Sequence, residues 1–292
     1  MNNKKLEEIL KIVKNTALKA GEKILEVYNS NDFQVRFKEG ELPFGLADEL
    51  SNVEICKNLN KNFPDFGILT EEKIDKNLLS ELPKSLEKSL NNWKKSKYTW
   101  VVDPLDGTKD FINKTGEFGV LIGLIENKKP ILGLNYYPVS KTFYFATKGC
   151  GAYKEGRDGK LERIFIRNKS DFKKIVMLKS KTDSDNKILN KFIKDQKIEE
   201  YLKVGSLGLK ACKVAEGLAD LYVLLSNKPS IWDICSSQVI IEEAGGKVSD
   251  IKGKPIDYRP ENTTRLSNGL IVANKKLHNS VVKIFLNQKT AL

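Results

Sequence analysis

The fold of this chain is decided by one stretch, Tyr98-Thr99-Trp100-Val101-Val102-Asp103-Pro104-Leu105-Asp106-Gly107-Thr108. Its β-branched and aromatic first half predicts a strand over residues 98–102. The strand is expected to end at Asp103, because Pro104 stiffens the exit and Gly107 permits tight backbone geometry. Asp103 and Asp106 then flank one bend, so we expect both carboxylates to face a common point.

Two carboxylates about 4 Å apart repel each other by roughly 4 kcal/mol at an effective dielectric near 20. Other acids could join them: Glu71, which follows the apolar run 66–69, and Asp233 in Ile231-Trp232-Asp233. Such a cluster needs cations, and an all-oxygen ligand set favours Mg²⁺, Mn²⁺ or Ca²⁺. The amides of Gly107 and Thr108, at a possible helix start, would add an anion pocket. Cations beside exposed amides predict a magnesium-dependent phosphomonoesterase.

The motif has two other interpretations. Asp-Pro and Asp-Gly are ordinary turn formers, so the isolated pattern indicates a turn more often than a site. The segment Asp106-Gly107-Thr108 also resembles the end of the DxDGT signature of haloacid-dehalogenase-like phosphatases. Their mechanism needs a nucleophilic aspartate two residues earlier, and Pro104 stands there. A metal-activated water is therefore favoured over a covalent aspartyl-phosphate.

The composition narrows the possible chemistry. The 292 residues are 40% hydrophobic and 30% charged, as in a soluble globular protein. A single histidine, His278, which we expect on the surface, argues against Ser-His-Asp catalysis and histidine-ligated metals. Four cysteines without a CxxC pair argue against a zinc site or a disulfide framework. No apolar run is long enough to span a membrane, and the early acids predict no secretory signal, hence a cytoplasmic protein.

The net charge of +12 raises the possibility of nucleic-acid binding. The lysines are interleaved with acids, as between Lys4 and Lys23, and no basic-aromatic pattern occurs. The positive net charge is therefore attributed to a lysine-rich composition rather than to a polyanion-binding surface, and no nucleic-acid partner is expected. The non-enzyme alternative is a basic nucleic-acid-binding protein on a degenerate phosphatase fold. A positive field would equally attract a small anionic phosphate ester.

Hydrophobic periodicity predicts the remaining elements and an α/β (α+β) fold class. We divide the chain into an N-terminal α+β half, 1–165, and a C-terminal α/β half, 166–292. An exposed helical excursion is expected over 73–97, with two alternatives: it covers the site or it only extends the surface. The other expected elements are helices over 4–28, 48–59, 185–194, 207–216 and 234–244, and strands over 119–126, 130–137, 141–147, 151–154, 174–178 and 220–225.

Three motifs in order resemble the inositol monophosphatase superfamily: Leu69-Thr70-Glu71-Glu72, Trp100 through Phe111, and Trp232-Asp233-Ile234 through Gly246. DPLDGTKDF, with Gly205-Ser206 through Lys210 and the segment 215–222, is most similar to the CysQ-type 3'(2'),5'-bisphosphate nucleotidases. The resemblance implies a layered α/β/α/β/α sugar-phosphatase fold. It also implies two to three Mg²⁺ ions, possible replacement by Mn²⁺, and inhibition by Li⁺.

The resemblance implies metal ligands residue by residue. Glu71, Asp103 and the Leu105 carbonyl would hold one magnesium. Asp103, Asp106 and Asp233 would hold a second, and a third, looser ion would lie near Glu71.

It implies substrate contacts in the same way. Thr108, with Asp48, would orient the attacking water, and the Gly107 and Thr108 amides would bind the scissile phosphate. Asp233 would also face the substrate. Lys210 is a candidate for a second substrate phosphate, against the alternative of a solvated helix lysine.

Two positions depart from the superfamily pattern: Gly45 replaces a threonine, and Asp183 replaces a histidine. The second departure concerns nucleotide recognition rather than hydrolysis. The expected reaction is hydrolysis of 3'-phosphoadenosine 5'-phosphate to AMP and phosphate. The alternatives are an inositol monophosphatase and a fructose-1,6-bisphosphatase-like sugar phosphatase. A monomer or a homodimer is expected.

Overall fold

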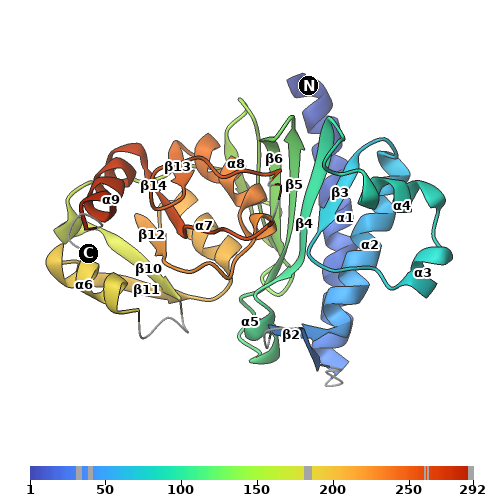
Figure 1. Ribbon diagram of the computed structural model, residues 1–292, viewed down its shortest axis with the longest axis horizontal. Helices are drawn as coiled ribbons and strands as arrows, with labels where there is room; N and C mark the ends of the chain where they lie inside the picture. The colour runs from blue at the N-terminus through green and yellow to red at the C-terminus, as the bar shows by residue number, and fades with distance from the viewer. Residues whose placement is uncertain (31–34, 39–41, 181–185, 260, 262, 289–292) are drawn as a thin grey trace.

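The computed structural model describes residues 1–30, 35–38, 42–180, 186–259, 261 and 263–288. Its strands form a seven-stranded sheet in the order β3-β4-β5-β6-β7-β8-β9 and a five-stranded sheet in the order β11-β10-β12-β14-β13, beside a β1-β2 ribbon (Figure 1). The expected boundary at 165/166 falls between the last strand of the first sheet and the first strand of the second. The strands are β1 Val35–Lys38, β2 Leu42–Gly45, β3 Gly67–Thr70, β4 Tyr98–Asp106, β5 Gly119–Glu126, β6 Lys129–Tyr137, β7 Thr142–Thr147, β8 Ala152–Glu155, β9 Leu161–Ile164, β10 Val176–Ser180, β11 Glu200–Val204, β12 Leu221–Leu224, β13 Gly246–Ser249 and β14 Leu270–Asn274.

Helices form three layers around the two sheets (Figure 1). The first pair, α1 and α2, covers one face of the larger sheet, while α7 and α8 fill the space between the sheets. The outer face of the smaller sheet is covered by α6 and α9. The helices are α1 Asn3–Ser30, α2 Leu46–Asn62, α3 Lys76–Ser80, α4 Lys84–Asn91, α5 Thr108–Ile112, α6 Lys187–Asp195, α7 Leu207–Ala215, α8 Cys235–Glu243 and α9 Lys275–Gln288, with short 3₁₀ turns η1 Phe172–Lys174 and η2 Ile231–Asp233.

Separate apolar clusters hold these layers together. In α1, Leu6, Ile9, Val13 and Ala17 are buried at helical spacing and pack toward β5 and β6. A second cluster joins the larger sheet to α7 and α8 and continues to the smaller sheet. A third lies between the smaller sheet and the outer helices. The α/β/α/β/α layering expected from the sequence is confirmed.

The α8 helix approaches the larger sheet at two glycines. A Cβ on Gly123 would lie 2.7 Å from the Cys235 sulfur, and one on Gly133 would lie 2.0 Å from the Ser236 carbonyl oxygen. Neither distance is tolerated by real side chains, so the absence of a side chain permits this packing. Asn135 then joins the layers, donating to Ser237 Oγ at 2.8 Å and accepting from Ser236 Oγ at 2.6 Å.

The critical strand is longer than the sequence suggested. We expected it to end at Asp103, but β4 continues to Asp106. Its pairing with β5 loses register between these two aspartates, so the bend lies inside the strand. Gly107 then adopts a φ of +92°, which favours glycine, and caps the short helix α5.

Two further expectations are wrong. His278 is fully buried rather than on the surface, and its Nε2 lies 2.8 Å from Ser249 Oγ. The segment 73–97 is not a wholly exposed excursion, because Leu86 of α4 is fully buried in the core beneath α2. Among the described residues, no helix is long and apolar enough to cross a membrane.

Candidate active site

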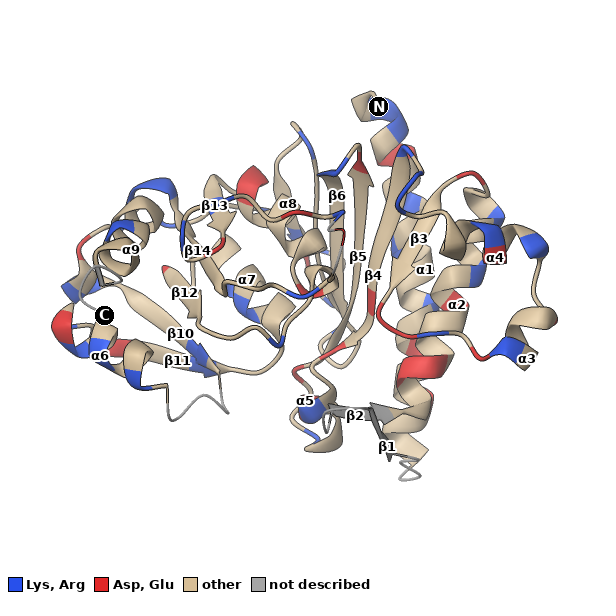
Figure 2. Cartoon of the chain, viewed as in Figure 1, with Lys and Arg blue, Asp and Glu red and all other residues tan. Residues whose placement is uncertain are grey.

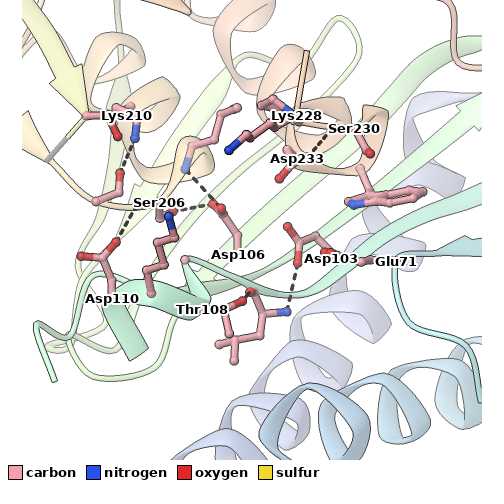
Figure 3. A pocket seen from close by; sticks show the side chains of 18 of the residues that line it. Glu71, Asp103, Asp106, Thr108, Asp110, Ser206, Lys210, Lys228, Ser230 and Asp233 are labelled. Atoms are coloured by element: carbon pink, nitrogen blue, oxygen red, sulfur yellow. Dashed lines mark hydrogen bonds between the residues drawn. The ribbon is translucent and has the colours of Figure 1, made fainter. Parts of the chain in front are cut away.

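A cavity of about 450 Å³ lies between the two halves, within the size range of small-molecule sites. Asp103 and Thr108 line it from the N-terminal half, and Ser206 and Asp233 line it from the C-terminal half (Figure 3). The described residues of 73–97 do not line this cavity. Several of them instead line a separate hollow beside β3, so this segment does not cover the site.

Three carboxylates converge in the cavity. Asp103, Asp106 and Asp233 each offer an oxygen, and these atoms lie within 4.8 Å of one another. Burial raises the pKa of Asp103 well above its usual range, and repulsion by Glu71 and Asp106 raises it further. Burial and the same two carboxylates raise the pKa of Asp233. The cluster therefore carries charge repulsion that a bound cation would relieve.

Asp106 is held by the first turn of α7. Both of its oxygens accept hydrogen bonds, from the Ser206 hydroxyl, the Leu207 amide at 3.1 Å and the Gly208 amide at 2.7 Å (Figure 3). Burial raises the pKa of Asp106, whereas the bonds from Ser206 and Gly208 lower it. No local sequence pattern marks this contact, because Ser206 lies 100 positions after Asp106 in the chain.

The turn that precedes α7 is held by further acids. The Gly205 amide donates to Glu117 at 2.5 Å, and the Ser206 amide donates to Asp110 at 3.3 Å. Ser206 has a φ of +20°, outside the usual range for a residue with a side chain. Together with the bonds to Asp106, these contacts fix the α7 start against the N-terminal half.

Asp233 is positioned by a tight turn ahead of α8. Its carboxylate accepts a 2.5 Å hydrogen bond from the Ser230 amide, within the 3₁₀ turn η2. Trp232 is partly buried and packs against the core between the sheets while also lining the cavity. The Trp232 side chain therefore joins the η2 turn that carries Asp233 to the core between the sheets.

Most of the other predicted residues meet at the cavity. Glu71, Leu105 and Gly107 line it, although Glu71 lies outside the group of three converging carboxylates. Thr108 Oγ1 donates to the Leu105 carbonyl at 3.3 Å. This hydrogen bond connects the residue expected to orient the water with an expected metal ligand. Asp48 is buried near Asp103 and raises its pKa, but it is not among the described residues that line the cavity.

Lys210 is a buried residue, and the alternative of a solvated helix lysine is wrong. Its Nζ donates to the Gly205 carbonyl at 2.6 Å, and its charge lowers the pKa of Asp106. The two departures from the superfamily pattern lie elsewhere. Gly45 precedes α2 as its N-cap, and Asp183 lies outside the described residues.

The donor set fits a hard divalent cation. It consists of buried carboxylate oxygens in mutual repulsion, with the Leu105 carbonyl close by. No described cysteine lines the cavity, and His278 lies in a different part of the fold. Soft metals that prefer sulfur or imidazole are therefore disfavoured.

The sequence profile of the inositol monophosphatase family matches residues 5–290. The chain belongs to this family. The 3'(2'),5'-bisphosphate nucleotidase CysQ of Salmonella typhimurium is 34% identical over 256 residues, covering 87% of this chain and 94% of that protein. The fructose-1,6-bisphosphatase/inositol-1-monophosphatase of Aquifex aeolicus is 29% identical and covers 96% of each chain.

The fold agrees with this membership. The crystal structure of CysQ from Bacteroides thetaiotaomicron superimposes with a TM-score of 0.70 at 30% identity, covering 91% of this chain and 96% of that one. Members of this family are metal-dependent phosphatases, and the oxygens of Asp103, Asp106 and Asp233 lie close enough together that they could hold a metal ion. The protein is therefore a phosphoric monoester hydrolase.

Proposed function

We propose that this family member is a Mg²⁺-dependent 3'(2'),5'-bisphosphate nucleotidase that hydrolyses 3'-phosphoadenosine 5'-phosphate to AMP and phosphate. The observation that carries the proposal is that two buried carboxylates, the half-buried Asp233 and the start of α5 meet in one cavity. The similarity to CysQ proteins over most of the chain supports the nucleotide substrate.

Each residue has a part in the proposed reaction. Glu71, Asp103, Asp106, Asp233 and the Leu105 carbonyl are the proposed Mg²⁺ ligands. Bound magnesium supplies Lewis acidity and lowers the pKa of a coordinated water.

The protein itself binds the substrate and orients the nucleophile. The amides of Gly107 and Thr108 receive the scissile phosphate, and the Thr108 hydroxyl, already bonded to the Leu105 carbonyl, orients the attacking water. Asp48, expected to share this role with Thr108, is buried outside the cavity lining, and its carboxylate raises the pKa of Asp103 by charge repulsion. Because Pro104 stands where a nucleophilic aspartate would be needed, we expect inversion at phosphorus and no phosphoenzyme.

An inositol or sugar phosphatase is the second candidate. The similarity to the Aquifex aeolicus protein favours it, because that relative covers 96% of this chain. The non-enzyme alternative has less support, because Glu71, Asp103, Asp106 and Asp233 are all retained and share one cavity.

Phosphate release distinguishes these candidates. We would compare 3'-phosphoadenosine 5'-phosphate, inositol 1-phosphate and fructose 1,6-bisphosphate, with Mg²⁺ and with a chelator. The proposal predicts the largest kcat/KM for the nucleotide and no turnover without divalent metal. A larger kcat/KM for the inositol ester would reassign the substrate. Strong, length-dependent nucleic-acid binding without Mg²⁺-dependent turnover would contradict the enzyme. Inhibition by Li⁺ is expected in the same assay.

A further inference from the structure

Two cations of the C-terminal half lie at the rim of the cavity. Lys228 and Arg265 both line it, and both are exposed. In the part of the chain that the structure describes, neither forms an ion pair with a carboxylate. Arg167 differs, because it pairs with the buried Asp220 at 2.7 Å. The rim therefore presents positive charge that the fold itself does not neutralise.

Backbone pairing holds these cations beside a predicted metal ligand. Segment 264–266 pairs with segment 229–231 through hydrogen bonds of 2.8 and 2.9 Å. The Arg265 guanidinium also donates to the Lys228 carbonyl at 2.7 Å. In Figure 3, Lys228 lies above Asp233, on the side away from Asp103. One cavity therefore holds the three carboxylates and, beyond Asp233, the two cations.

We propose that Lys228 and Arg265 form a second anion subsite, which binds the non-scissile phosphate of a nucleoside bisphosphate. This inference rests on the proposed function and names the residues that select its substrate. A guanidinium presents paired donors that match phosphate oxygens, and a lysine ammonium adds a mobile point charge. A phosphomonoester would use only the end of the cavity that contains the carboxylates.

The other lysines of the cavity are less suited to this role. Lys210 is buried and donates to the Gly205 carbonyl, so its ammonium is engaged by the α7 turn. Lys109 lies in α5, and the next residue, Asp110, also lines the cavity with a negative charge that opposes an anion. This differs from the sequence-based assignment of the second phosphate to Lys210.

The test compares two substrates that share a scissile ester. One is 3'-phosphoadenosine 5'-phosphate, and the other is adenosine 3'-monophosphate, which lacks the second phosphate. The variants are Lys228→Ala, Arg265→Ala and the double variant. Lys228→Arg retains the charge, and Lys254→Ala removes an exposed lysine of the same half that lies outside this cavity. Thermal unfolding of each variant would verify folding.

We expect each alanine variant to lose about tenfold in kcat/KM for the bisphosphate, and the double variant about a hundredfold. The value for the monophosphate should change less than twofold, and the two controls should resemble the wild type. Equal losses on both substrates, or no loss on the bisphosphate, would overturn the inference while the nucleotidase activity stands. Failure of the wild-type protein to hydrolyse the bisphosphate would overturn both the inference and the proposed function.

Discussion

The amide of Gly208 donates a 2.7 Å hydrogen bond to the carboxylate of Asp106, which lies 102 positions earlier in the chain. This bond connects the start of α7 to the end of β4, and therefore one half of the molecule to the other. The chemistry of Asp106 consequently depends on a helix whose sequence is remote from its own motif.

We predict that Gly208→Ala impairs the site. The new Cβ would lie 2.7 Å from Asp106 Oδ2 and 2.8 Å from the Leu121 side chain. Replacing a helical glycine by alanine normally raises the free energy of unfolding by about 1 kcal/mol. A lower free energy of unfolding in this variant would therefore indicate the steric clash. We expect kcat to fall at least tenfold, measured by phosphate release. Gly156→Ala, facing only the end of the Asp158 carboxylate, is the control and should be nearly neutral.

Asp103→Asn should remove nearly all activity, about a thousandfold or more, while the fold persists. The substitution removes a buried charge whose pKa burial and neighbouring acids raise, so the metal-free protein should be at least as stable. Phosphate release and thermal unfolding in chelator measure the two effects. Asp195→Asn on α6 is a surface control. Near-normal turnover of the Asp103 variant would refute the ligand assignment.

Magnesium should stabilise the folded protein. A ligand that binds only the folded state at a hundred times its Kd adds about 2.7 kcal/mol to the free energy of unfolding. We therefore expect Tm to rise with Mg²⁺ in the wild-type protein and much less in Asp233→Asn. An equal rise in both proteins would place the stabilising ion elsewhere.

His278 should make stability depend on pH. Burial, aided by the charge of Lys247, lowers its pKa from 6.5 to about 4. Between these two pKa values, His278 binds more protons in the unfolded chain than in the folded protein. The free energy of unfolding therefore falls as the pH drops. From pH 8 to pH 5 the contribution is about 2 kcal/mol. Denaturant unfolding of the wild-type protein and of His278→Gln at pH 8 and at pH 5 measures this contribution. The variant should lose less stability when the pH falls.

Much of this arrangement could be predicted from local sequence. The spacing of Leu6, Ile9 and Val13 predicts α1 because its buried face repeats with the helical period. The run from Tyr98 predicts β4, and the pair Asp103 and Asp106 predicts a cluster of carboxylates that could hold a metal. Such features depend on residues that lie close together in the chain, so their pattern can be seen in a single sequence.

Other features depend on partners that are distant in the chain. The bonds from α7 to Asp106 join residues about a hundred positions apart, and no local pattern marks them. His278 is buried because β13 supplies Ser249 as a partner. Lys210 turns inward because its own turn exposes the Gly205 carbonyl. In each case tertiary packing overrode the general tendency of charged or polar residues to face solvent.

The two glycines beneath α8 have a consequence for ion choice. They fix how near the helix that follows Asp233 can come to the sheet that carries Asp103 and Asp106. Magnesium needs ligand distances of about 2.1 Å, whereas calcium accepts about 2.3–2.6 Å. A methyl group at Gly133 would push the helix outward and widen the gap. Gly133→Ala should therefore shift the preference toward larger ions, and tighter binding of Ca²⁺ relative to Mg²⁺ in the variant would show this.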